Sequence, residues 1–264
     1  MAASTWAAVS PGHDVSARLP SLVDQYDLRF YFDPVCPFAW MTSKWVRLVM
    51  ERSAYTVDWR FISLRLVNAT VDYDAHFPPE YEAGHTAGLK LLRVAAKVRA
   101  EHGPEAIGPL YGALGAHIFE STSTSGGWLA DAGRIDARVV GGLLAGIGLD
   151  AGLAEALEDS SFDGELQAET DEALALTGKD VGTPIIHVQP PEGIAFFGPV
   201  ISRLPSPEDA VRLWDHVIGL ASFPGFAELK RSLREQPQLP AFGVAANQVG
   251  TQEDWHGGSR RLKK

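Results

Sequence analysis

The single cysteine of this 264-residue chain, Cys36, lies within the segment YFDPVCPFAW. A cysteine at the start of a helix can act as a nucleophile, because free backbone N–H groups and the helix dipole stabilise its thiolate. Pro37 suits the first helical turn, where an N–H group would have no partner within the helix. We therefore predict thiol chemistry and a lowered pKa for Cys36, although burial or the charge of a nearby Asp33 would oppose that shift. An inert buried thiol is the alternative.

The position three residues after Cys36 holds Ala39, where a second cysteine would complete a C-x-x-C pair. A dithiol enzyme uses its second cysteine to expel a mixed disulfide from the first. Cys36 can form such an adduct, but only a thiol from outside the chain can resolve it. A lone cysteine also excludes an internal disulfide framework and a multi-cysteine zinc site.

A proline opens the apolar segment TPIIHV, which we predict to be a strand at 183–188. Proline in this place is restricted to a sheet edge, a strand start or a cis peptide bond. Because only about 5–6% of X–Pro bonds are cis, an ordinary trans bond before Pro184 is the alternative. We interpret His187, in the same segment, as a packed strand histidine rather than a catalytic base.

The elements around Cys36 have the pattern of a strand, a helix and a second strand. The apolar, partly alternating segment 27–33 predicts a strand, and residues 55–64 predict another. Between them, from Phe38 onwards, apolar residues recur at spacings of three and four, as on one face of a helix. The predicted opening is therefore β-α-β, with Cys36 at the head of the helix.

A long helical stretch, about 74–178, follows and is broken by glycine, proline and serine. Strands resume with TPIIHV and with IAFFG (194–198), on either side of the hairpin turn QPPEG. The segment SPEDAVRLWDHVIGLAS predicts a helix with Ser206 as its N-cap. We expect an irregular extension at 1–26. We also expect a loosely ordered tail at 235–264, because that segment is rich in Pro, Gln and Gly.

Composition excludes several classes of protein. With 45% hydrophobic and 21% charged residues, the chain can bury a substantial core. Its net charge of −10 and isoelectric point near 5.2 argue against a surface for nucleic acid or anionic membranes. No apolar run approaches the ~20 residues of a membrane span, and the N-terminal segment lacks the basic and apolar regions of a secretory signal. We therefore expect a cytoplasmic protein.

Several segments together resemble the DsbA superfamily of thioredoxin-fold proteins. Within it they resemble the actinobacterial mycothiol-dependent reductases, often called mycothiol-dependent nitroreductases. The segments are FDPVCPFAWMTSKW, ISLRLVN, PPEYEAG, DVGTPIIHV, AFFGPVISRLP, LWD and FAELKR, from about Arg29 to Glu235. The resemblance implies an α/β, thioredoxin-like fold with an inserted α-helical domain. It implies a thioredoxin-like domain formed by 27–73 and 179–234, and a helical domain at 74–178.

The resemblance also implies which residues form the site. Cys36 corresponds to the active cysteine and Pro184 to the cis-proline, and the backbone of Thr183 would pair with an incoming thiol substrate. The remaining substrate- and thiol-binding positions are Pro37, Phe38, Trp40, Asn68 and Tyr81. The implied cofactor is mycothiol or another low-molecular-weight thiol. No metal is expected, because the histidines are scattered without ligand spacing.

The implied partners are a small-molecule thiol and a small-molecule or disulfide substrate, with neither nucleic acid nor membrane; a homodimer is left open. The chain departs from these reductases, which usually carry Cys-Pro-Trp-Cys where this sequence has Cys-Pro-Phe-Ala. Phe119 stands where a histidine is expected, with His117 two residues earlier, and the hairpin around QPPEG is longer. From these differences we expect a bulkier or more apolar substrate.

Three functions stay open on this basis. The first is a monothiol oxidoreductase of the DsbA family that uses a low-molecular-weight thiol through a mixed disulfide on Cys36. The second is a thiol-cofactor transferase or isomerase, like the kappa-class glutathione transferases and chromene-carboxylate isomerases, in which the protein activates the cofactor's own thiol. The third is a catalytically degenerate binding protein. Ala39 fits all three.

Overall fold

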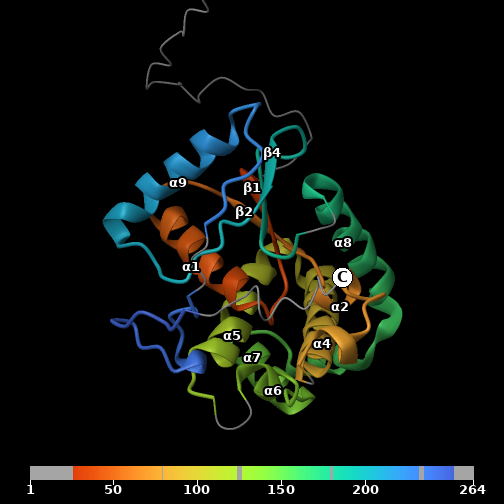
Figure 1. Cartoon of the computed structure of the whole chain (residues 1–264). Helices are drawn as coiled ribbons and strands as arrows, with labels where there is room; N and C mark the ends of the chain where they lie inside the picture. Colours follow the sequence, from red (N-terminus) through yellow and green to blue (C-terminus); the bar gives the residue numbers. More distant parts are fainter. Residues whose placement is uncertain (1–25, 79, 124–126, 179–180, 232–234, 253–264) are drawn as a thin grey trace, which may run out of the picture.

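A four-stranded sheet forms the centre of the protein, with the strand order β2-β1-β3-β4 (Figure 1). β1 (Leu28–Phe32) runs parallel to β2 (Val57–Phe61) and antiparallel to β3 (Ile185–Val188). β3 pairs antiparallel with β4 (Ile194–Phe197), which confirms the predicted hairpin around QPPEG. This computed structural model describes residues 26–78, 80–123, 127–178, 181–231 and 235–252.

Helices cover both faces of the sheet. α1 (Pro37–Arg52) connects β1 to β2 and packs on one face beside α9 (Pro207–Ala221). The buried rings of Trp45 and Trp214 join these two helices, with centroids 5.5 Å apart. α8 (Asp163–Thr177) lies on the opposite face (Figure 1). A parallel pair joined by a helix and followed by an antiparallel hairpin confirms the predicted thioredoxin-like fold class.

Alternation along β1 decides which helix covers each face, because successive side chains of a strand point to opposite sides. Arg29 and Tyr31 both reach Glu172 of α8, at 3.0 Å from Nη1 and 2.8 Å from the hydroxyl oxygen. Phe32 points the other way, and its ring stacks on Tyr111 of α5 (Ile107–Phe119) with centroids 3.8 Å apart. The sheet is therefore covered on both faces around the strand that leads to Cys36.

The predicted helical stretch lies between β2 and β3 and is confirmed, while the exact boundaries of the two domains stay predictions. α2 (Leu64–Val67) lies before the predicted start of this stretch at about residue 74. Besides α5 and α8 the stretch contains α3 (Tyr73–His76), α4 (Glu80–His102), α6 (Trp128–Ala132) and α7 (Ala137–Gly146), with the 3-10 turns η1 (Pro104–Ala106), η2 (Ala151–Glu158) and η3 (Ser160–Phe162). The strand predicted at 55–64 is shorter than expected, because Ser63 caps α2 by accepting from the Leu66 N–H. The predicted N-cap Ser206 is confirmed, with its Oγ 3.2 Å from the Asp209 nitrogen.

Two glycines allow the inserted helices to approach the segment that carries Cys36. A Cβ on Gly88 of α4 would lie 2.6 Å from Asp33 Oδ1 and 2.8 Å from Val35 Cγ2. A Cβ on Gly115 of α5 would collide with the ring of Trp40. Because real Cβ atoms do not come this close to their neighbours, α4 and α5 can pack here only through glycine.

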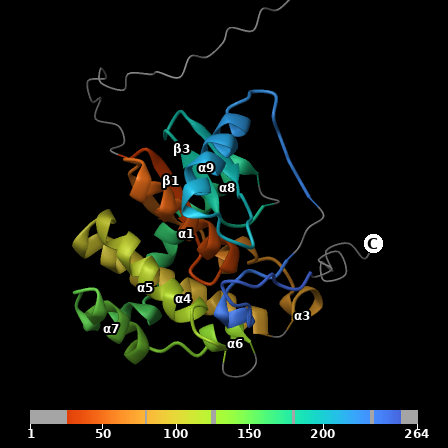
Figure 2. The ribbon, with the colours of Figure 1, turned by 90° about the vertical axis from the view of Figure 1, so that its left-hand side faces the viewer.

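The expectation of a loosely ordered tail is wrong for residues 235–252, which pack against the rest of the molecule. Leu239 is fully buried, and the 3-10 turn η4 (Pro240–Phe242) contacts α5. A single β-bridge joins Glu235 to Gln252, and the segment lies next to α6 (Figure 2). A few apolar side chains are enough to anchor a segment that is otherwise rich in Pro, Gln and Gly. Residues 1–25 of the irregular extension predicted at 1–26, and the tail end at 253–264, lie outside the described residues.

Candidate functional site

Cys36 lies at the N-cap position of α1, and Pro37 is the first helical residue. The Cys36 sulfur accepts a hydrogen bond from the Ala39 N–H at 3.4 Å. It also donates one to the backbone oxygen of Thr183, again at 3.4 Å. The Thr183–Pro184 peptide bond is cis. The structure thus brings together the lone cysteine and the Thr-Pro segment that begins the second half of the sheet.

The Cys36 thiol is almost completely buried, with 7% of the residue exposed. Burial raises its pKa to about 12; the Ala39 N–H opposes this shift, and the charge of Asp33 adds to it. The predicted lowering of the pKa is therefore wrong. A helix terminus offers only about 0.3–2 kcal/mol to an anion, whereas the loss of water around a thiolate costs more than that. The resting form of Cys36 is the protonated thiol.

Asp33 holds the segment before Cys36 against α2. Its carboxylate is fully buried and accepts hydrogen bonds from the Val35 N–H at 2.9 Å and from the Leu64 N–H at 2.7 Å. Burial raises the pKa of Asp33 to about 7, and these two N–H groups oppose the shift. The sequence pointed to Asp33 only as a charge near Cys36. Its role as a link to α2 could not be recognised before the position of α2 was known.

Trp40 and Phe38 flank the first turn of α1 in different ways. Phe38 is partly exposed, whereas Trp40 is buried and its Nε1 donates to Glu120 Oε1 at 2.9 Å. The same carboxylate oxygen pairs with Lys44 Nζ at 2.7 Å. Trp40 is thus fixed in place beneath the site, and Phe38 is the aromatic residue of this turn that a ligand can touch.

Tyr111 lies among the residues around Cys36, and the sequence analysis did not identify it. It is fully buried, and its ring lies 5.6 Å from that of Trp40 in an edge-on arrangement. Burial raises the pKa of its hydroxyl well above the usual value, and the Cys36 thiolate would raise it further. Tyr111 therefore belongs to the core beneath Cys36. Its sequence context, an apolar helix, gave no sign of this position.

Asn68 and Tyr81 belong to the neighbouring helices α2 and α4, which contact each other. Asn68 is buried at the end of α2, where its Nδ2 donates to the Leu64 oxygen at 2.8 Å. The ring of Tyr81 stacks on Phe77 at 5.4 Å. Because the Leu64 N–H binds Asp33, α2 connects Asn68 to the Cys36 segment. A contact of Asn68 or Tyr81 with a small thiol stays a prediction.

A buried histidine lies next to Tyr81. His85 Nδ1 is 3.0 Å from the hydroxyl oxygen of Tyr73, and the His85 ring centroid is 5.6 Å from that of Tyr81. Burial lowers the pKa of His85 to about 4, so this imidazole is neutral at physiological pH. These rings stiffen the start of α4. His187 is likewise buried, within β3, as expected for a packed strand histidine.

Phe119 does not face solvent. Its ring is fully buried between Trp40 and Trp128, with centroid distances of 6.4 Å and 5.4 Å. Phe119 therefore does not line an exposed surface, and its expected effect on the size of the substrate stays a prediction. His117, the other residue considered at this place, is exposed.

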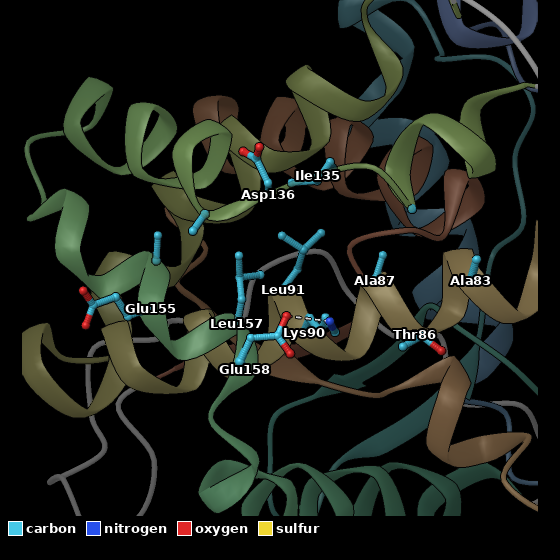
Figure 3. A pocket seen from close by; sticks show the side chains of 13 residues that line it. Ala83, Thr86, Ala87, Lys90, Leu91, Ile135, Asp136, Glu155, Leu157 and Glu158 are labelled. Atoms are coloured by element: carbon cyan, nitrogen blue, oxygen red, sulfur yellow. Dashed lines mark hydrogen bonds and ion pairs between the residues drawn. The ribbon is translucent and has the colours of Figure 1, made fainter.

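A cavity of about 580 Å³ lies in the helical part, and none of the predicted site residues lines it. Ala87 and Leu91 of α4 and Leu157 of η2 line it, and Lys90 forms an ion pair with Glu158 beside it at 2.6 Å (Figure 3). Cys36, Thr183 and Pro184 do not line this cavity. The cavity therefore gives no support to the predicted thiol site.

Neither metal-site geometry nor a membrane-spanning helix is found in the described part of the chain. Among the residues that the structure describes, no three His, Cys, Asp or Glu side chains lie together as metal ligands would. No helix within the same ranges is both long and apolar enough to cross a bilayer.

Two solved structures that resemble this chain have low sequence identity to it. Cytosolic disulfide reductase DsbM from Pseudomonas aeruginosa is 19% identical, and the match covers 74% of this chain and 99% of that one with a TM-score of 0.43. Pseudomonas aeruginosa DsbA is 16% identical, with 77% and 88% covered and a TM-score of 0.40.

Comparison of sequences is more specific. The uncharacterized protein Rv2286c of Mycobacterium tuberculosis (strain ATCC 25618 / H37Rv) is 31% identical over 213 residues, which cover 80% of this chain and 82% of that protein. Residues 35–231 match the model of the Rv2466c-like family, described as mycothiol-dependent nitroreductase Rv2466c. This match includes Cys36 and the Thr183–Pro184 bond and covers most of the chain. The chain therefore belongs to the Rv2466c-like family.

Proposed function

We propose that this chain is a monothiol oxidoreductase in which Cys36 exchanges disulfides with a low-molecular-weight thiol, first of all mycothiol. The observation that carries the proposal is the position of the Cys36 sulfur, which lies between the Ala39 N–H and the Thr183 carbonyl at the head of α1. Membership of the Rv2466c-like family supports the choice of mycothiol. The proposed location is the cytoplasm, where such thiols are kept reduced.

The proposed reaction has two exchange steps. Cys36, as the thiolate, attacks one sulfur of a small disulfide; a new S–S bond forms, the old one breaks, and the second sulfur leaves with the electron pair and takes up a proton. An external thiolate then attacks the adduct sulfur that is not Cys36. This second step releases a new small disulfide and restores Cys36, so Ala39 needs no sulfur of its own.

Residues of the chain have separate roles in these steps. The Thr183 carbonyl accepts the thiol proton in a hydrogen bond and so keeps the resting thiol neutral and oriented. The Ala39 N–H points at the sulfur and stabilises its negative charge once the proton has left. In the proposal Pro37, Phe38, Asn68 and Tyr81 hold the small thiol, and the Thr183 backbone pairs with it. Residues 27–73 with 179–234 form the proposed thioredoxin-like domain, and 74–178 the helical one.

The raised pKa of Cys36 favours a second candidate function. A thiol with a pKa of about 12 is a poor nucleophile at neutral pH, but it remains a hydrogen-bond donor. In a transferase or isomerase the cofactor's own thiolate would attack the substrate, and the chain would supply binding and orientation. A binding protein without turnover is the remaining outcome.

Intact mass spectrometry tests the first candidate. The protein is incubated with oxidised mycothiol and, separately, with oxidised glutathione. We expect one covalent adduct from oxidised mycothiol, its loss on addition of free thiol, and no adduct on the Cys36→Ser variant. Absence of any adduct on the folded wild-type protein would contradict the proposal.

A turnover assay separates the candidates. Consumption of free thiol in step with reduction of a disulfide or nitroaromatic substrate supports the oxidoreductase. Thiol-dependent conversion of an electrophilic substrate without net oxidation of the thiol supports the transferase or isomerase. Tight thiol binding with neither kind of turnover supports the binding protein.

A further inference from the structure

The N-terminal end of the segment 235–252 is attached by hydrogen bonds and an ion pair to the loop that follows β4. Glu235 is almost completely buried; it pairs with Arg203 Nε at 3.1 Å and accepts from the Ser202 hydroxyl at 2.8 Å. The Gln238 N–H donates to the Ser202 backbone oxygen at 2.7 Å. A buried carboxylate with two side-chain partners and a backbone bond beside it forms a specific attachment.

The loop that receives this end is itself tied to the surroundings of Cys36. The Gly198 N–H donates to the Pro184 oxygen at 2.9 Å. The Pro199 oxygen accepts from the Thr42 hydroxyl, in the second turn of α1, at 2.8 Å. The first end of the segment is therefore linked, through one short loop, to the proline that follows Thr183 and to the helix that begins at Cys36.

The middle of the segment attaches to the helical part. Phe242 packs on Trp128 of α6 with ring centroids 5.5 Å apart, and Trp128 packs on Phe119, which supports Trp40. Leu239 is fully buried in the core of the molecule. The segment thus crosses from the sheet side of the molecule to the helical side, near the start of α1 (Figures 1 and 2).

We propose that residues 235–252 form a fixed wall of the Cys36 site, which admits small disulfides and excludes folded protein substrates. The choice of disulfides rests on the function proposed above, whereas the wall itself rests on packing alone. Cys36 is only 7% exposed, so an incoming sulfur has little room. A protein disulfide must bring two stretches of backbone to the thiol, and a wall across one side of the site prevents that. The family match ends at residue 231, so this wall lies outside the matched range.

The test compares two reagents that differ in size alone: N-ethylmaleimide and the same maleimide carried on a long polyethylene glycol chain. Cys36 is the only thiol, so labelling rates report its accessibility directly. The variants are Glu235→Gln, Phe242→Ala and the two together. The control is Leu229→Ala, since Leu229 is 73% exposed. Melting temperatures show that each variant is folded under the labelling conditions.

The size ratio is the labelling rate with N-ethylmaleimide divided by the rate with the long reagent, each relative to the rate in unfolded protein. We expect this ratio to be well above one in the wild-type protein. In the double variant this ratio should fall by about tenfold, which corresponds to about 1.4 kcal/mol of lost local closure. Leu229→Ala should leave the ratio unchanged. A size ratio of one in the wild type, or an unchanged ratio in a folded double variant, would contradict the proposal that residues 235–252 form a wall.

A second comparison concerns substrates. Oxidised mycothiol and insulin are offered to wild type and to the double variant, and the adduct on Cys36 is followed by intact mass. The wall predicts an adduct from oxidised mycothiol in both proteins, and one from insulin only in the variant. An insulin adduct on wild type would contradict the wall while leaving thiol exchange intact. No adduct from either disulfide, together with a size-dependent maleimide ratio, would contradict the proposed function and not the wall.

Discussion

The sulfur of Cys36 lies 3.4 Å from the backbone oxygen of Thr183, although 147 positions separate the two residues along the chain. The raised pKa of Cys36 makes the neutral thiol its resting form, and in this contact the thiol is the donor. Reactivity at this site therefore depends on how the proton leaves. A preformed thiolate, as expected at an exposed helix terminus, is not present.

The reactivity of Cys36 should depend steeply on pH. With a pKa of about 12, the thiolate fraction grows about tenfold for each pH unit through the neutral and weakly alkaline range. The rate of labelling by N-ethylmaleimide, measured from pH 6 to pH 10, should rise throughout without a plateau. A plateau with a midpoint below about 8.5, the value of a free cysteine, would contradict the effect of burial.

Substitution of Ala39 by cysteine should create a pair of thiols on one helical turn. The Ala39 nitrogen is already 3.4 Å from the Cys36 sulfur, and the residue is fully buried. We expect the oxidised Ala39→Cys variant to lose two hydrogens by intact mass and to shorten the life of any mixed disulfide on Cys36. Ala39→Ser is the matched control, since it adds a polar atom without a thiol. An adduct that is equally long-lived in Ala39→Cys would contradict this prediction.

Substitution of Asp33 by asparagine should lower the free energy of unfolding, more at low pH than at high pH. Asparagine has one acceptor oxygen, so either Val35 or Leu64 loses its hydrogen-bond acceptor, at a cost of about 1–3 kcal/mol. The wild-type protein loses stability at higher pH, because its buried Asp33 must then carry a charge. The pKa of Asp33 is about 7 in the folded protein, above the ordinary aspartate value of 3.8, so stability falls as pH rises from about 3.8 to about 7.

Urea unfolding at pH 5 and pH 8 checks the prediction for Asp33. The difference between wild type and Asp33→Asn should be smaller at pH 8, because the variant lacks the buried charge. Cys36, Tyr73 and Tyr111 interact electrostatically with Asp33, but all three have raised pKa values and do not titrate within this window. A difference that grows between pH 5 and pH 8 would have the wrong sign.

Substitution of Gly88 by alanine should separate α4 from the Cys36 segment. The new Cβ would meet Asp33 Oδ1 at 2.6 Å and Val35 Cγ2 at 2.8 Å, and overpacking of this kind costs about 1–3 kcal/mol. We expect a lower melting temperature and faster labelling of Cys36 by N-ethylmaleimide. Gly142→Ala in α7 is the control, because nothing lies within 4 Å of its Cβ. That variant should be neutral or stabilised by about 0.5–1 kcal/mol.

The thioredoxin-like fold and the meeting of Cys36 with the Thr183–Pro184 segment could be predicted from the resemblance to the DsbA superfamily. Local patterns reveal β1, α1 and β3, and the Cys-Pro and Thr-Pro segments each point to a defined place in the fold. The burial of Cys36 could not be predicted in this way. Desolvation depends on everything that surrounds the sulfur, including Thr183 from the far half of the chain, whereas the local sequence shows only the helix terminus.

The segment 235–252 shows a second limit of the same kind. Its composition is typical of a loose tail. Its three anchoring residues, Glu235, Leu239 and Phe242, are spaced by four and three positions, but prolines between them and the charge of Glu235 hide any sign of a packed segment. Their partners Arg203 and Trp128 lie in distant parts of the sequence. Such contacts can be recognised only when the positions of the anchoring residues and of their partners in the fold are known.

The long separation between Cys36 and Thr183 also has a consequence for synthesis. During translation α1 emerges well before β3, so the thiol has neither its acceptor nor its cover until the inserted helices and the second half of the sheet are complete. In that nascent chain the pKa of Cys36 is that of an ordinary cysteine, and folding then raises it to about 12. Contacts between residues so far apart also form slowly. The lone thiol of this protein is therefore most vulnerable to unselective oxidation before folding ends, and the completed fold limits its reactions to molecules that reach the buried site.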